Sequence, residues 1–146
     1  MRYYQYKFKF YLNASHAIYI HGNLGERHSH TWEIMLHTLK MKENFIEFHH
    51  VEERMEGFFE TYQGRYLNEV EPFQTMNPTI ENCCEYFKQE LADLLRQEGW
   101  ILLAIELSET PTRSYVINLL EDMGDAYEKD LEAMADVILD KLTKGI

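Results

Sequence analysis

Three histidines are the residues of this sequence whose types and spacing best suit chemistry. His28 and His30 are separated by one residue, and side chains two positions apart in a β-strand point to the same face. His16 continues an alternation of apolar residues that begins at Tyr6, so it belongs to the matching face of an earlier strand. If the two segments pair as a hairpin, three neutral imidazoles converge and leave a bound Zn²⁺ with one open coordination position. That arrangement is typical of a catalytic rather than a structural zinc site.

A short H-x-H motif is also compatible with ordinary solvated histidines. The chain contains seven histidines, so pairs with this spacing arise by chance. On spacing alone, both interpretations stay open, and the elements that position the histidines have to be considered.

Hydrophobic periodicity predicts these elements. Residues 3–15 and 29–41 alternate between apolar and polar side chains, as half-buried strands do, and a turn is expected at residues 42–44. An apolar stripe at three- and four-residue spacing, from Val51 to Tyr66, predicts a helix. A second helix follows, with Asn77 or Thr79 as its N-cap, and ends at Gly99. Two further strands are predicted at residues 100–107 and 115–119.

The element order ββααββ predicts an α+β fold: a four-stranded antiparallel sheet with two helices on one face. We assign residues 1–120 to this domain and residues 121–146 to a C-terminal helical extension of it. The extension has its own apolar stripe from Tyr127 to Leu142, with acidic residues on the other face.

Composition bounds the number of domains and the classes of partner this chain could have. The 146 residues suit one domain, and the net charge of −11 argues against nucleic acid as a partner, because phosphates require a basic face. Cys83 and Cys84 are adjacent on a helical pattern, which favours two buried thiols over a disulfide. We find neither a signal peptide nor an apolar run long enough to span a membrane, so a cytoplasmic location is expected.

Several motifs together resemble one family. They are Ala14-Ser15-His16, His28-Ser29-His30, Tyr66-Leu67-Asn68, the segment Asn77-Pro78-Thr79-Ile80-Glu81-Asn82, and Glu109 in a Ser-Glu-Thr-Pro-Thr run. They resemble the 6-pyruvoyl-tetrahydropterin synthase and 6-carboxytetrahydropterin synthase family, which has the tunnelling fold and includes queuosine-pathway enzymes. The resemblance covers the chain from about Tyr6 to Asn118.

The resemblance implies a set of roles. His16, His28 and His30 match the zinc ligands, and Glu109 matches the glutamate that holds the pterin ring through two parallel N–H donors. Thr79 is expected to be a helix cap first and a ligand contact second. Members form trimers that stack into hexamers, with sites between subunits, so a homo-oligomer is expected.

The sequence also departs from the family. The catalytic cysteine position holds Leu24, and the Asp-His pair aligns with Gln63 and Gly64, none of which transfers protons at neutral pH. Glu26 is the candidate replacement base, because some divergent members place a glutamate in this loop.

Three functions therefore remain open. The first is a zinc-dependent lyase that acts on a reduced pterin with a remodelled acid–base set. His21, His49 and His50 are further candidates for its acid–base residues. The second is a non-catalytic pterin- or purine-binding or regulatory oligomer. The third, a structural oligomer with vestigial histidines, is disfavoured by the retained zinc ligands and Glu109.

Overall fold

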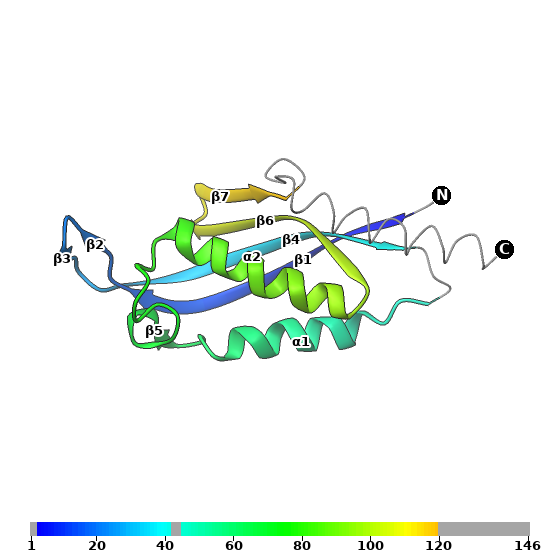
Figure 1. Cartoon of the computed structure of the whole chain (residues 1–146), viewed down its shortest axis with the longest axis horizontal. Coiled ribbons are helices and arrows are strands. Elements are labelled where there is room, and N and C mark those ends of the chain that lie inside the picture. The colour runs from blue at the N-terminus through cyan, green and yellow to red at the C-terminus, as the bar shows by residue number, and fades with distance from the viewer. Residues whose placement is uncertain (1–2, 42–44, 120–146) are drawn as a thin grey trace.

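A computed structural model describes residues 3–41 and 45–119 of the chain. The main sheet has the strand order β5-β1-β4-β6-β7, and its four longest strands are antiparallel. These are β1 (Tyr3–His16), β4 (His28–Met41), β6 (Trp100–Thr110) and β7 (Arg113–Asn118). Figure 1 shows β1 and β4 running beside each other along the length of the molecule. The predicted four-stranded antiparallel sheet is confirmed.

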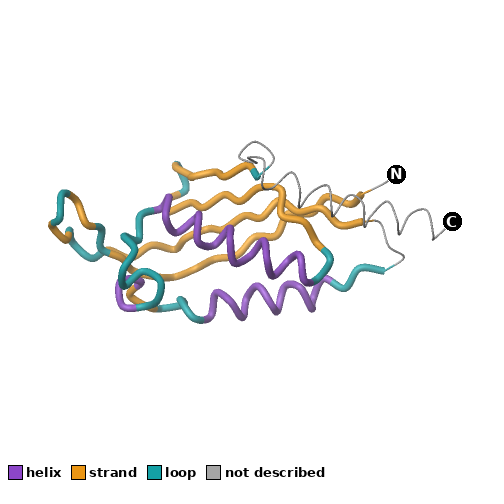
Figure 2. The backbone as a smooth tube through the Cα atoms, in the orientation of Figure 1, coloured by secondary structure: helices purple, strands orange, loops and turns teal. Residues whose placement is uncertain are grey.

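Two helices, α1 (Phe48–Glu60) and α2 (Ile80–Gln97), cover the same face of this sheet (Figure 2). A side-chain cap begins α2, because the Thr79 hydroxyl accepts from the Asn82 backbone N–H at 3.2 Å. The chain leaves α2 at Gly99, whose φ of 80° is a left-handed conformation that glycine adopts without strain. Of the two predicted cap residues, the structure therefore selects Thr79.

The core lies between the helices and the inward face of the sheet. Alternate side chains of β1 and β4 are buried, as their period of two requires, and the fully buried Trp32, Ile34 and Leu36 follow the histidines on β4. The helices contribute Val51, Met55, Phe59, Cys83, Cys84, Phe87, Leu91 and Leu95. Cys83 and Cys84 are buried free thiols, as the sequence predicts. None of the described helices is both long enough and apolar enough to span a membrane.

Short elements are added to the predicted order. A two-residue strand, β5 (Arg65–Tyr66), pairs in parallel with Ala14 and Ser15 at the edge of β1. It is followed by a 3-10 turn, η1 (Leu67–Glu69). The helix predicted to extend to Tyr66 is wrong at its end: α1 stops at Glu60 and Tyr66 lies in β5. A turn that contains Gly64, at a φ of 69°, redirects the chain between them.

A small hairpin connects the two long strands. It consists of β2 (Tyr19–Ile20) and β3 (Asn23–Leu24), and it projects beyond the end of the main sheet (Figure 1). Its turn places His21 and Gly22 at positive φ, as a tight two-residue hairpin requires. The predicted turn at residues 42–44 and the predicted C-terminal helix from Tyr127 to Leu142 lie outside the described residues.

Candidate metal centre

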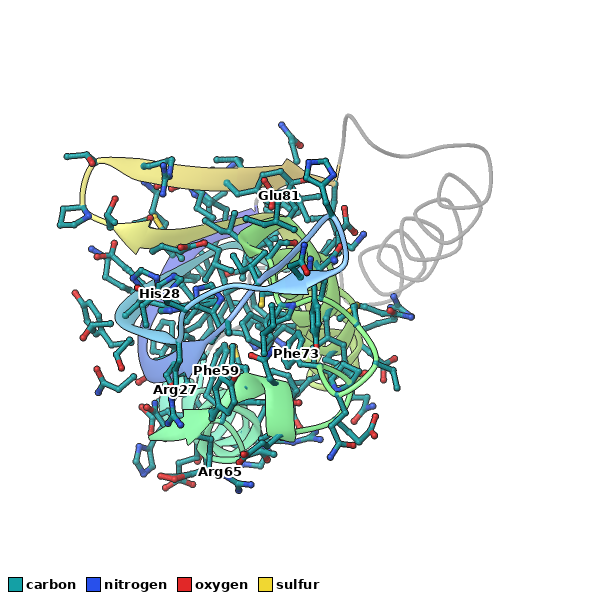
Figure 3. All side chains as sticks on the ribbon, turned by 90° about the vertical axis from the view of Figure 1, so that its left-hand side faces the viewer. Arg27, His28, Phe59, Arg65, Phe73 and Glu81 are labelled. Atoms are coloured by element: carbon teal, nitrogen blue, oxygen red, sulfur yellow. The ribbon has the colours of Figure 1, made fainter. Side chains whose placement is uncertain are left out.

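The pairing of β1 with β4 brings the three predicted histidines together at one end of the sheet. His16 is the last residue of β1 and pairs with His28, the first residue of β4, while His30 pairs with Ala14. Figure 3 views the molecule from this end, with His28 beside the strands and Phe73 on the side of the helices. Glu109 reaches the same place from the end of β6, which neighbours β4. The register of three strands therefore builds the cluster.

One potential ligand atom from each of His16, His28, His30 and Glu109 lies within 4.8 Å of all the others. The three imidazole rings are 4.5 to 5.1 Å apart between centroids and are tilted edge to face. In this arrangement one ring nitrogen of each histidine lies close to a nitrogen of the other two. Three imidazoles and a carboxylate are donors that zinc accepts.

Backbone carbonyls fix the tautomers of two of the histidines. Nδ1 of His16 lies 2.7 Å from the Pro78 carbonyl oxygen, and Nδ1 of His28 lies 3.1 Å from that of Glu26. A carbonyl only accepts, so each Nδ1 donates its hydrogen and leaves the Nε2 lone pair free. Metal-binding histidines are oriented in this way by an outer hydrogen bond.

Burial favours the neutral form of two of the imidazoles, those of His16 and His30. His16 is fully buried, and its Nε2 atom and that of His30 have no hydrogen-bond partner within the described part of the chain. Burial lowers the pKa of both side chains, although the Glu109 carboxylate acts in the opposite direction. Only the neutral imidazole binds a metal. Buried nitrogen lone pairs without a partner are what a metal site would use, so these residues fit Zn²⁺.

The structure places Glu109 among the histidines. Its Oε2 atom lies 3.3 Å from Nε2 of His30 and 3.9 Å from Nε2 of His16, and its side chain is 9% exposed. The carboxylate therefore lies beside the histidines with little access to water. Thr79, the other predicted ligand contact, has its hydroxyl engaged as the cap of α2.

Glu26, the predicted base, lies in the loop immediately before β4. Its side chain is exposed, and we find no hydrogen bond or ion pair for its carboxylate among the described residues. The other candidate groups lie elsewhere: His49 pairs with Glu53 on α1, and His50 pairs with Glu98 after α2. His21 occupies the exposed turn of the hairpin.

Leu24, Gln63 and Gly64 stand where the family resemblance implies acid–base groups. Leu24 lies on β3 and is 49% exposed. The Gln63 side-chain amide binds the backbone of β1 twice: Oε1 accepts from Asn13 N at 3.0 Å, and Nε2 donates to the Tyr11 carbonyl at 2.8 Å. Gly64 N donates to the Asn13 carbonyl at 2.6 Å. These two residues therefore tie the chain to the edge of β1.

Sequence reasoning missed the structural role of two asparagines. The Asn68 amide accepts from Ala17 N and donates to the Ala17 carbonyl, at 2.9 and 2.8 Å. Asn77 makes the same pair of bonds with the backbone of Tyr19, at 2.9 and 3.0 Å. Each side chain thus imitates a neighbouring strand and fixes the segment between His16 and the hairpin. The only sequence signal for this role was that Asn68 and Asn77 belong to the Tyr-Leu-Asn and Asn-Pro-Thr motifs.

Comparison with known proteins agrees with this architecture. The sequence profile of 6-pyruvoyl tetrahydropterin synthase matches residues 5–119. The chain belongs to this family. No curated protein sequence matches it.

Solved structures of family members have the same fold at low sequence identity. The Caenorhabditis elegans synthase superposes with a TM-score of 0.70 at 17% identity, over 81% of this chain and 96% of its own. The Plasmodium falciparum synthase gives a TM-score of 0.61 at 12% identity, over 79% of this chain and 96% of its own. A Plasmodium vivax synthase altered at a catalytic glutamate superposes with a TM-score of 0.63 at 12% identity, over 80% of this chain and 98% of its own.

Proposed function

We propose that this chain binds Zn²⁺ through His16, His28 and His30 and holds a reduced pterin or a related ring beside the metal. The observation that carries the proposal is the pair of buried Nε2 atoms without a hydrogen-bond partner among the described residues. Burying such a group costs free energy unless a partner uses it, and a zinc ion uses the lone pair directly. When bound, zinc supplies a Lewis acid for oxygen atoms of the ligand.

Glu109 is the proposed anchor of the ring. A 2-amino-4-oxopyrimidine edge presents two parallel N–H donors, and one carboxylate accepts both in a bidentate pair. The low exposure of Glu109 strengthens such a pair, because water competes less for the carboxylate. Its position beside the histidines means that a ring held there lies next to the metal.

The chemistry we propose is of the lyase type, with Glu26 as the base. Its carboxylate is free of partners among the described residues and lies two residues before His28. A glutamate is named as a catalytic residue in the Plasmodium vivax synthase, which supports this residue type as the base. In this chain, zinc binding and ring binding orient the ligand while Glu26 accepts a proton from it.

A specific observation favours a second candidate, a non-catalytic pterin- or purine-binding protein that acts as a regulatory oligomer. Leu24 and Gly64 carry no acid–base group, and both ends of the Gln63 amide are used by the β1 backbone. In either case we propose that the chain assembles as a trimer or hexamer.

Two measurements test the proposal and separate the candidates. Titration calorimetry of zinc-loaded protein with neopterin should show binding that Glu109→Gln abolishes and Glu106→Gln retains, because Glu106 pairs instead with His37. Turnover of dihydroneopterin triphosphate that falls in Glu26→Gln supports the lyase, while binding without turnover supports the regulatory protein. Equal neopterin affinity in wild type and Glu109→Gln contradicts the ring anchor.

A further inference from the structure

The geometry points to a second role for Glu109: it is the fourth metal ligand in the ligand-free protein, and a bound ring withdraws it and opens the metal. The second half of this inference rests on the proposed function, because the ring is what competes for the carboxylate. The first half concerns the metal site alone.

The spacing around Glu109 is that of a coordination shell. With Zn–N and Zn–O lengths of about 2.0–2.2 Å, neighbouring donor atoms of a tetrahedral site are about 3.3–3.5 Å apart. Oε2 of Glu109 lies 3.3 Å from Nε2 of His30 and 3.9 Å from Nε2 of His16. The carboxylate thus already stands at ligand–ligand spacing from one histidine and slightly beyond it from another.

Hydrogen bonding does not explain this contact. Nε2 of His16 has no hydrogen to donate, because Nδ1 carries it toward the Pro78 carbonyl. Neither His16 nor His30 has a hydrogen-bond partner at Nε2 within the described residues. A lone pair that faces a carboxylate oxygen in a buried site is unfavourable unless a cation lies between them.

The surroundings of the Glu109 carboxylate also favour a cation beside it. Its side chain is 9% exposed, and the basic side chains within 4.0 Å of it in the described part of the chain are only those of His16 and His30. A divalent cation held by the three histidines would place an opposite charge next to this carboxylate.

The two roles of Glu109 compete with each other. A bidentate pair with the ring uses the two carboxylate lone pairs that point forward, one on each oxygen, and leaves only the less favourable outer lone pairs for a metal. A carboxylate that turns to anchor a ring is therefore withdrawn from the metal. The ligand-free site is then closed by four protein ligands, and ring binding converts it into a three-histidine site with an open position. The metal becomes available only where a ring is already held.

Visible absorption of the Co²⁺-loaded protein tests the inference, because the d–d bands of cobalt report its donor set and coordination number. With Co²⁺ alone, Glu109→Gln should differ in spectrum from wild type and bind Co²⁺ at least about 10-fold more weakly, since even outer-sphere partners of a metal contribute that much. Glu106→Gln, an acid-to-amide change on the same strand outside the cluster, should match wild type. Neopterin should move the wild-type spectrum toward that of Glu109→Gln.

The outcomes separate the inference from the proposed function. Identical cobalt spectra and affinities in wild type and Glu109→Gln would overturn the fourth ligand. Neopterin binding that leaves the wild-type spectrum unchanged would overturn the withdrawal. A wild type that binds no neopterin contradicts the proposed function, and the comparison with Co²⁺ alone then still decides whether Glu109 is a ligand. The isosteric glutamine preserves side-chain volume, and an unchanged urea midpoint of the metal-free variant verifies folding.

Discussion

Replacing Gln63 with alanine should destabilise the protein by loosening the segment after α1 from the edge of β1. The substitution removes two hydrogen bonds to the backbone of Asn13 and Tyr11, of 3.0 and 2.8 Å. A hydrogen bond contributes about 0.5–1.5 kcal/mol net, so the pair contributes about 1–3 kcal/mol to the free energy of unfolding. Because both bonds are exposed and water replaces part of each, we expect a loss in the lower half of that range.

Urea unfolding measures this loss as a shift in the midpoint at unchanged slope. The matched control is Gln89→Ala, an exposed glutamine on α2, which should change the free energy of unfolding by no more than about 0.5 kcal/mol. Gln63→Asp carries no N–H to donate to the Tyr11 carbonyl and is one methylene shorter, so it should lose at least that bond. If Gln63→Ala unfolds at the same urea concentration as Gln89→Ala, the amide does not tie the edge of β1, and the reasoning fails.

The remaining predictions concern the base, the cap and pH. Glu26→Gln should reduce any turnover by about 10²-fold or more while leaving neopterin affinity unchanged, as calorimetry would show; an unchanged rate would exclude this base. Thr79→Ala should lower the free energy of unfolding by about 1 kcal/mol in urea titrations, through loss of the α2 cap; no change would mean that the bond contributes nothing. Burial lowers the pKa of His16 and His30 below the usual 6.5, so the unfolded chain binds more protons just below that pH. Metal-free protein should therefore lose stability as the pH falls below about 6.5, and His16→Gln should reduce this dependence; equal slopes in both proteins would contradict it.

Periodicity was sufficient to predict the layout of the sheet and helices. The alternation along β1 and β4 directs the apolar side chains inward, and the same alternation carries His16, His28 and His30 to one face. The stripe of α2 and its cap follow from local chemistry in the same way. These features depend on residues close together in the chain, so they can be predicted from a single sequence.

Other features depend on contacts between distant segments. β5 is only two residues long, too short for a periodic pattern, and it exists because Arg65 and Tyr66 reach the edge of β1. The asparagines that hold the hairpin act across about fifty residues of sequence, as the separation of Asn68 from Ala17 shows. The approach of Glu109 to the histidines likewise needs the register between β4 and β6, which no local signal specifies.

The metal content of the purified protein tests the central claim most directly. Elemental analysis by mass spectrometry should find one zinc per wild-type chain and clear loss in the double variant His28→Ala/His30→Ala. The control His49→Ala/His50→Ala removes two imidazoles that pair with glutamates away from the cluster, and it should keep the metal. Unchanged zinc in His28→Ala/His30→Ala, or the same loss in both double variants, would contradict a metal centre built on these histidines.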